Sequence, residues 1–255
     1  MATVNDIYKL LASCAPVEKK LEFDNVGILV GRSDHPVDRV LVALDITDEV
    51  IREAVGKNAD LIVSHHPLFF ELKSVTNATW TGERVLTLAE NRIAAICMHT
   101  NLDAARGGVN DALLSTLGCT YVGELDPVTE IGRIGVRETP TDLISFMSEI
   151  KTTLRCAGLR YHDAGRPVYK VAVCGGSGGS DIALAHAAGC DTYVTADIKY
   201  DPFLEARNFG INLIDADHFC TENVVVPVLQ TWIQEAFPSV EVILSEVHGQ
   251  TARFF

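Results

Sequence analysis

The strongest constraint in this sequence is the alternation of short apolar runs with segments of helical periodicity. Buried-type strands are expected at 39–46, 61–64, 93–98, 168–174 and 192–195. Most of them lead into a helix-like segment, and this βα order continues to the end of the chain. Repeated βα units are typical of layered α/β folds with largely parallel strands. We therefore predict an α/β protein with mixed, largely parallel sheets.

The chain also shows signs of a second block of elements that begins near Asp126-Pro127. No low-complexity linker separates the two blocks, so the boundary is expected to be tight. We predict one domain from residues 1–125 plus 218–255, which would carry the site described below, and a second from 126–217. Thr47 is predicted to cap the helix that follows it, and Ser180 to cap a helix over 181–189.

The composition is that of a globular protein, with 47% hydrophobic and 22% charged residues. No apolar run reaches the roughly 18 residues of a membrane span, and the first residues lack the layout of a secretory signal. The seven cysteines are scattered and form no CxxC pair, so neither a disulfide framework nor a zinc ribbon is indicated. These features predict a cytoplasmic protein.

The formal net charge of −13 argues against nucleic acid as a partner. The 21 lysines and arginines are spread along the chain, and Lys19-Lys20 is their one adjacent pair. A small molecule is the more plausible ligand, and no membrane association is expected.

Three short polar segments begin where predicted strands end. They are SHHP with His65 and His66, HTNLD with His99 and Asp103, and DADHFCTE, in which His218 and Glu222 are four residues apart. Ligands of α/β sheets sit at the carboxyl ends of strands, so these segments are expected to converge. Taken singly, each has an ordinary explanation: loop histidines, a turn-forming aspartate, or a capped helix start.

Together the segments offer imidazole nitrogens and carboxylate oxygens, a donor set suited to Zn, Mn, Fe, Ni or Co. His65, His66, Asp103, His218 and Glu222 are more ligands than one catalytic zinc ion needs. Two divalent ions per chain would use all five, and such a pair suits hydrolytic chemistry. A single site or a purely structural role for these residues stays open on spacing alone.

Other segments carry weaker signals. CGGSGGS at 174–180 is interpreted as a tight turn rather than a phosphate-binding loop, since it matches no nucleotide-binding fingerprint. Cys220 is interpreted as a packing residue, because no base can be assigned to it. His99 is the candidate catalytic residue, as a proton shuttle, or else a brace for Asp103.

The segments FDNVGILVG, VALDIT, LIVSHHPLFF, HTNLDAARGGVNDALLSTLG and HFCTE resemble, in this order, the Nif-three-like family, also called GTP cyclohydrolase 1 type 2 homologs. The resemblance covers essentially the whole chain. It implies two interlinked α/β domains and a homohexameric ring. It also implies two metal ions bound by His65, His66, Asp103, His218 and Glu222, with Glu222 bridging.

The resemblance further implies a dinuclear metal-dependent hydrolase of a small molecule, such as an enzyme that opens the purine ring of GTP. The alternatives are a non-enzymatic metal-binding, metal-trafficking or regulatory scaffold, and a dinuclear phosphoesterase. The sequence departs from the family pattern at Ala196, Asp201 and Asp217 without losing a metal ligand. Substrate preference therefore does not transfer from the family, and the native metal is not specified by these ligands.

Overall fold

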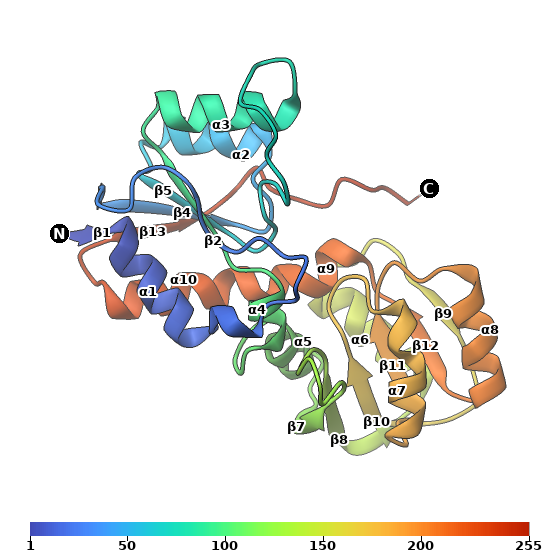
Figure 1. The fold of residues 1–255 in the computed structure, drawn as a ribbon. Helices are drawn as coiled ribbons and strands as arrows, with labels where there is room; N and C mark the ends of the chain where they lie inside the picture. The colour runs from blue at the N-terminus through green and yellow to red at the C-terminus, as the bar shows by residue number, and fades with distance from the viewer. Residues whose placement is uncertain (255) are drawn as a thin grey trace. The chain divides into compact units, whose positions relative to one another are not determined.

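The chain, described over residues 1–254 in a computed structural model, divides into two compact units (Figure 1). Unit 1 comprises Met1–Arg106 and Val226–Gly249, and unit 2 comprises Gly107–Val225 and Gln250–Phe255. These limits differ from those predicted for the domains. Residues 107–125 group with unit 2 because helix α5 (Val109–Thr116) packs against the strands of that unit's sheet.

Unit 1 is built on a five-stranded sheet in the order β13-β4-β5-β6-β2. Strands β13, β4, β5 and β6 are parallel, and β2 pairs antiparallel with β6. Their bounds are β13 Glu241–Leu244, β4 Arg39–Ala43, β5 Leu61–Ser64, β6 Ala94–Cys97 and β2 Gly27–Val30. Every residue of β5 and β6 is buried, as expected for parallel strands covered on both faces.

Helices cover both faces of this sheet (Figure 1). Helices α1 (Val4–Cys14) and α10 (Val226–Ala236) lie on one face, and α2 (Asp48–Gly56) and α3 (Trp80–Glu90) on the other. The Thr47 side chain accepts a hydrogen bond from the Val50 amide, which confirms the predicted cap of α2.

The remaining elements of unit 1 are short. A small antiparallel ribbon pairs β1 (Ala2–Thr3) with β3 (Pro36–Val37). The 3-10 turn η1 (Val17–Lys19) follows α1, and helix α4 (Thr100–Ala104) begins directly after the segment that leaves β6. The sequence had indicated a loop where α4 lies.

Unit 2 holds a six-stranded sheet in the order β7-β8-β10-β11-β12-β9, in which β10, β11 and β12 are parallel. The strands span β7 Thr120–Glu124, β8 Arg133–Thr141, β10 Val168–Val173, β11 Thr192–Thr195, β12 Asn212–Asp215 and β9 Arg160–His162. Two apolar clusters, one on each face, hold helices against this sheet.

The helices of unit 2 fall into two layers and a short connecting pair. Helices α5 and α6 (Leu143–Thr153) contribute to one apolar cluster, and α7 (Ile182–Ala187) and α8 (Tyr200–Phe209) to the other. Helix α9 (His218–Glu222) and the 3-10 turn η3 (Asn223–Val225) lead out of the unit.

The predicted fold class, α/β with mixed, largely parallel sheets, is confirmed, although only the unit 1 sheet is largely parallel. The unit 2 sheet is mixed, with three antiparallel pairings beside the two parallel ones. One predicted cap is wrong. Helix α7 begins at Ile182 after a 3-10 turn (η2, Gly179–Asp181), so Ser180 lies inside that turn and no side chain caps the helix. No helix in residues 1–254 has the length and apolar character needed to cross a membrane.

Gly31 provides a test of the unit 1 sheet. Its φ is +97°, and an added Cβ would lie 2.8 Å from Cα of Ala94 on β6. We expect Gly31→Ala to lower the free energy of unfolding by more than about 1 kcal/mol, through both strain and overpacking. Chemical denaturation would measure the change.

Gly56→Ala is the matched control, because Gly56 ends helix α2 and no atom lies within 4 Å of a Cβ built there. That substitution should leave stability unchanged or raise it by up to about 1 kcal/mol. Equal effects of the two substitutions would contradict the packing assigned to Gly31.

Candidate metal centre

The carboxyl ends of three adjacent parallel strands in unit 1 carry the polar side chains of the candidate site. Asp45 follows β4, His65 and His66 follow β5, and His99 follows β6. The strands are paired in register at these ends, so their exits lie at one edge of the sheet. This confirms, for unit 1, the expectation that the segments after the strands come together.

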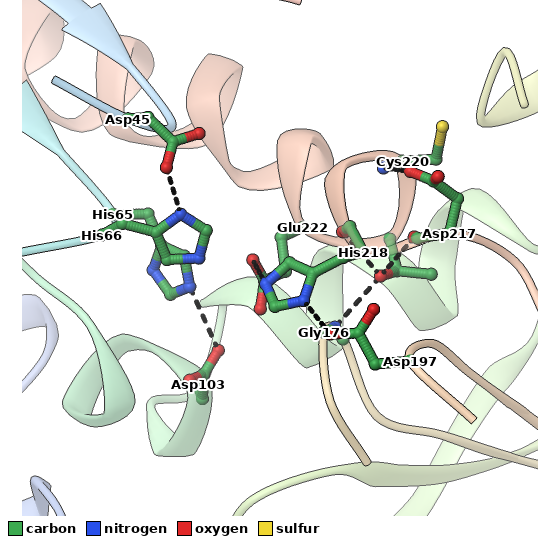
Figure 2. A network of polar contacts seen from close by, with 12 residues as sticks. Asp45, His65, His66, Asp103, Gly176, Asp197, Asp217, His218, Cys220 and Glu222 are labelled. Carbon is green, nitrogen blue, oxygen red and sulfur yellow. Dashed lines mark hydrogen bonds and ion pairs between the residues drawn. The ribbon is translucent and has the colours of Figure 1, made fainter. Parts of the chain in front are cut away.

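His65, His66 and His99 form what we call the imidazole cluster. One ring nitrogen of each lies within 4.8 Å of the others, close enough to hold one metal ion. The ring centroids of His65 lie 4.9 Å from His66 and 5.2 Å from His99. Asp103, from helix α4, places its Oδ1 3.7 Å from His65 Nε2, and both side chains are buried (Figure 2).

Each imidazole of the cluster is oriented through its Nδ1 atom. His65 Nδ1 lies 2.9 Å from the Met98 carbonyl oxygen, His66 Nδ1 2.7 Å from Asp45 Oδ1, and His99 Nδ1 2.8 Å from Asp24 Oδ1. A carbonyl or ionised carboxylate only accepts, so each Nδ1–H donates. In the neutral ring the lone pair is then on Nε2, which is the arrangement of metal-binding histidines.

Asp24, in the stretch FDNVG that by sequence alone is interpreted as a turn, is buried and fixes His99. Its Oδ2 accepts a hydrogen bond from the Thr100 amide at 3.0 Å, beside the His99 contact on Oδ1. Burial would raise the pKa of Asp24, but the hydrogen bonds from His99 and Thr100 outweigh it and hold that pKa well below its usual range. Asp24 is therefore an anion across the physiological range.

Asp45 holds His66 in the same way (Figure 2). It also contacts the C-terminal part of unit 1. His248 Nε2 lies 2.9 Å from the second carboxylate oxygen, Asp45 Oδ2. Burial would raise the pKa of Asp45, but hydrogen bonds from His248 and His66 lower it below its usual range. His248 therefore shares the Asp45 carboxylate with His66.

In unit 2, His218 and Glu222 open and close helix α9 and form the second donor group, which we call the α9 pair. His218 Nε2 lies 3.0 Å from Glu222 Oε2, as the four-residue spacing predicted. Asp197 Oδ2 accepts from His218 Nδ1 at 2.8 Å (Figure 2). Asp217, one of the departures from the family pattern, precedes His218, and its side chain caps α9 by accepting from the Cys220 amide at 3.1 Å.

The α9 pair binds a proton tightly. Burial would lower the pKa of His218, but the carboxylates of Glu222 and Asp197 raise it to about 9. At neutral pH the imidazole is therefore cationic and sits between two carboxylates. A divalent ion at Nε2 would take the place of this proton.

Gly176, in the CGGSGGS segment, makes room for Glu222. Its φ is +64°, and a Cβ at this position would lie 2.1 Å from Glu222 Oε1. The Gly176 amide donates to Thr221 Oγ1 at 3.0 Å, which joins the turn to α9. The interpretation of this segment as a tight turn is confirmed, and its glycine clears the space beside a donor group.

Asn110 and Asp111 have partners beyond their sequence-based interpretation. By sequence alone, Asn110 and Asp111 have the character of ordinary helix-start residues, and they do lie at the start of α5. Asn110 Oδ1 also accepts from the Gly175 amide at 2.8 Å, and Asp111 Oδ2 lies 2.8 Å from Nε of the buried Arg133. These hydrogen-bond partners could not be predicted from the sequence, because they lie 65 and 22 residues away along the chain.

Two further sequence-based interpretations concern Cys220 and His99. The neighbouring Cys156 thiol and burial raise the pKa of Cys220, which agrees with a packing role. The His99 ring contacts Asp24 through its Nδ1 atom. This contact decides neither of the two roles considered for His99, proton shuttle or brace for Asp103.

The donor chemistry fits a divalent ion in unit 1. His65 Nε2 and the Asp103 oxygen both bear lone pairs and face each other across 3.7 Å within the protein. Two metal–ligand bonds of about 2.1 Å at a near-tetrahedral angle separate their ligand atoms by about 3.4 Å. The neutral imidazoles, each held by an acceptor behind it, complete a mixed nitrogen and oxygen set.

Fold and site together define a two-unit α/β protein with imidazole and carboxylate clusters able to hold a metal ion. Residues 2–250 match the model of the family described as Duf34/NIF3 (NGG1p interacting factor 3). The chain therefore belongs to this family.

Relatives and solved structures agree with the assignment. The chain is 34% identical to a GTP cyclohydrolase 1 type 2 homolog of Clostridium perfringens over 251 residues, covering 95% of this chain and 96% of the relative. It is 37% identical over 238 residues to a protein of the same name from Streptomyces coelicolor, covering 87% and 82%. A crystal structure of a Bacillus cereus protein related to NIF3 matches with a TM-score of 0.93 at 25% identity, covering 100% of this chain and 99% of that one.

Asp24 gives a pH-dependent prediction for metal-free protein. Because its folded-state pKa is depressed, its contribution to stability is present above the unfolded-state value of about 3.9 and is lost as the pH falls toward the folded-state pKa. We expect Asp24→Asn to destabilise the protein by roughly 1.5–3 kcal/mol at pH 7, the contribution of a hydrogen bond to a charged group. The difference should shrink below about pH 4.

Urea denaturation of both proteins in chelator at pH 7 and at pH 3 would measure this difference. Asp34→Asn is the control, because Asp34 is exposed and pairs with Arg32 at the surface. A difference between wild type and Asp24→Asn that stayed constant with pH would exclude the assigned role.

Asp45 gives a second prediction, which concerns metal affinity. An asparagine at this position cannot accept from both His66 and His248, so the orientation of His66 is lost. We expect Asp45→Asn to weaken zinc binding 10- to 100-fold, as removal of a carboxylate behind a metal-bound histidine does elsewhere. Chelator competition on metal-free protein would measure it, with Asp34→Asn again as control; unchanged affinity would show that Asp45 does not position His66.

Proposed function

We propose that this protein is a dinuclear metal-dependent hydrolase that acts on a small molecule. In this proposal His65, His66, Asp103, His218 and Glu222 would hold two divalent ions per chain, with Glu222 shared between them as the family resemblance implies. The observation that carries the proposal is the orientation of the imidazoles: an acceptor behind each Nδ1 leaves Nε2 for an ion. That the imidazole cluster and the α9 pair serve one centre rests on the resemblance of all five residues to the family.

The ions would supply Lewis-acid activation of water and stabilise negative charge that develops in the transition state. The chain's own residues have separate tasks. Asp45 and Asp24 keep the imidazoles in the tautomer that leaves Nε2 basic. Asp197 orients His218 in the same way.

His99 is proposed as the residue that moves a proton. Its Nδ1–H donates to the anionic Asp24, and that carboxylate stabilises the imidazolium which forms when Nε2 accepts a proton. The pairing has the form of the aspartate–histidine couple that general bases use in other hydrolases. It supports proton transfer for His99, although the ring also lies within ligand range of His65 and His66.

The substrate proposed is a nucleotide or a related small molecule, and the reaction is hydrolytic ring opening. Support comes from the name shared by the relatives, GTP cyclohydrolase 1 type 2 homolog. We also propose a homo-oligomer, as the hexameric ring of the resembled family implies. Light scattering after size-exclusion chromatography would give the number of chains.

Metal content and turnover test the central proposal. Protein purified without added metal should contain, or take up from zinc, manganese or iron solutions, two ions per chain. Hydrolysis of at least one member of a nucleotide panel should stop when a chelator removes them. Absence of any bound ion after such loading would refute the proposal, and two ions without turnover would refute the enzymatic part.

Glu222→Gln tests the bridging role. Because a shared carboxylate contributes to both ions, we expect its loss to reduce the content of both, with the fold intact. Glu205→Gln is the control, since Glu205 is an exposed glutamate of the same unit. If one ion stayed bound with unchanged affinity, the two donor groups would serve separate ions and Glu222 would not bridge.

A further inference from the structure

Two exposed phenylalanines lie side by side in unit 1, and we call them the aromatic pair. Phe23 precedes β2, and Phe70 belongs to the segment that follows His66. Their ring centroids are 6.1 Å apart with the planes tilted by 51°. Phe23 is 65% exposed and Phe70 53%, so more than half of each residue's surface is available to a ligand.

The aromatic pair is held by a hydrogen-bonded framework on each side. The Asn25 side-chain amide donates to the Phe69 carbonyl at 2.9 Å, which ties the two segments together next to the rings. Asp24 lies between Phe23 and Asn25 and is anchored by the Thr100 amide. Exposed aromatic rings on such a framework lose little conformational entropy when a ligand binds, which favours recognition.

The pair is continuous with the imidazole cluster. The Phe70 ring centroid lies 6.0 Å from that of His99, with the planes at 60°, and His99 lies 5.6 Å from His66. The phenyl rings are therefore direct neighbours of the imidazole cluster that is proposed to bind metal. A small molecule with a reacting group at the imidazoles has the phenyl rings next to it.

We propose that the aromatic pair is the subsite for a planar heteroaromatic ring of the substrate. This inference rests on the proposed hydrolase and adds the residues that would recognise the ring of its substrate, Phe23 and Phe70, which favour a nucleobase-like ring over an aliphatic group. Phenyl rings offer a π-face and no hydrogen bonds, so they select a flat ring without specifying which base it is. Binding pockets for small molecules are commonly lined by aromatic side chains beside a few polar groups, as here.

A second copy of the chain is a less suitable occupant for the pair. Even complete burial of two aromatic side chains removes about 150–250 Å² each. A stable protein interface needs about 800 Å² on each partner. The area of the pair suits one ring system.

The experiment compares a ligand that has the ring with one that lacks it. Zinc-loaded protein would be titrated with GTP and with inorganic triphosphate in an isothermal calorimeter, and guanosine would report the ring without phosphates. We expect wild type to bind GTP at least tenfold more tightly than triphosphate. The double variant Phe23→Leu/Phe70→Leu should lose about 5- to 150-fold in GTP affinity, because base stacking is worth roughly 1–3 kcal/mol, with triphosphate binding unchanged.

Leucine keeps apolar bulk at both positions, so the comparison isolates the flat ring face. Trp80→Leu is the matched control, since Trp80 is another exposed aromatic residue of unit 1, on helix α3. It should leave both affinities unchanged.

Three outcomes would overturn the inference. One is equal binding of GTP and triphosphate by wild type, with guanosine not bound. Another is a double variant that binds GTP as wild type does. The third is a double variant with a changed number of chains by light scattering and unchanged ring binding, which would assign the pair to an interface between copies.

Metal content of the same samples separates this inference from the proposed function. If the protein holds two ions and binds GTP through its ring but shows no turnover, the subsite proposal stands and the hydrolase proposal is refuted. If the protein turns over a substrate that has no ring and does not prefer GTP to triphosphate, the hydrolase proposal stands and the subsite proposal is refuted.

Discussion

The parallel register of β4, β5 and β6 is the constraint on which the candidate site depends. Strands β5 and β6 are buried along their whole length, so a polar side chain fits only beyond the last strand residue. Register between the three strands then places Asp45, His66 and His99 at one edge of the sheet. The apolar strands thus determine where the imidazole cluster forms, although none of their own side chains takes part in it.

Carboxylates of Asp24 and Asp45 orient the imidazoles that the strand ends bring together. Asp24 and Asp45 are buried or half-buried anions whose charge is stabilised by the imidazoles they hold. Each therefore contributes to stability and to tautomer selection through the same hydrogen bonds. Because Asp24 also anchors the segment that carries Phe23, one buried carboxylate fixes both an imidazole and the backbone segment from which an aromatic ring of the proposed subsite projects.

Local patterns made the strands, the helices and the donor residues predictable. His65, His66 and His99 follow recognisable apolar runs, and His218 and Glu222 show their helical spacing directly. The residues behind them were not predictable, because the bonds from Asp24 to His99 and from His248 to Asp45 cross 75 and 203 residues of chain. Strand β7 was not predicted, because it is only partly buried and its sequence lacks a clear apolar pattern. The start of α7 was misplaced because a 3-10 turn precedes it.

The charges around the two donor groups match what two divalent ions would bring. Asp103, Asp24 and Asp45 surround the imidazole cluster, and Glu222 and Asp197 surround His218. In the proposed dinuclear centre these five carboxylates would nearly balance the four positive charges of the ions, so the outer aspartates would neutralise charge as well as orient rings. At the α9 pair, burial would lower the pKa of His218, but the carboxylates of Glu222 and Asp197 raise it and so retain a proton on the imidazole. Binding of an ion at the α9 pair would therefore release the proton from His218.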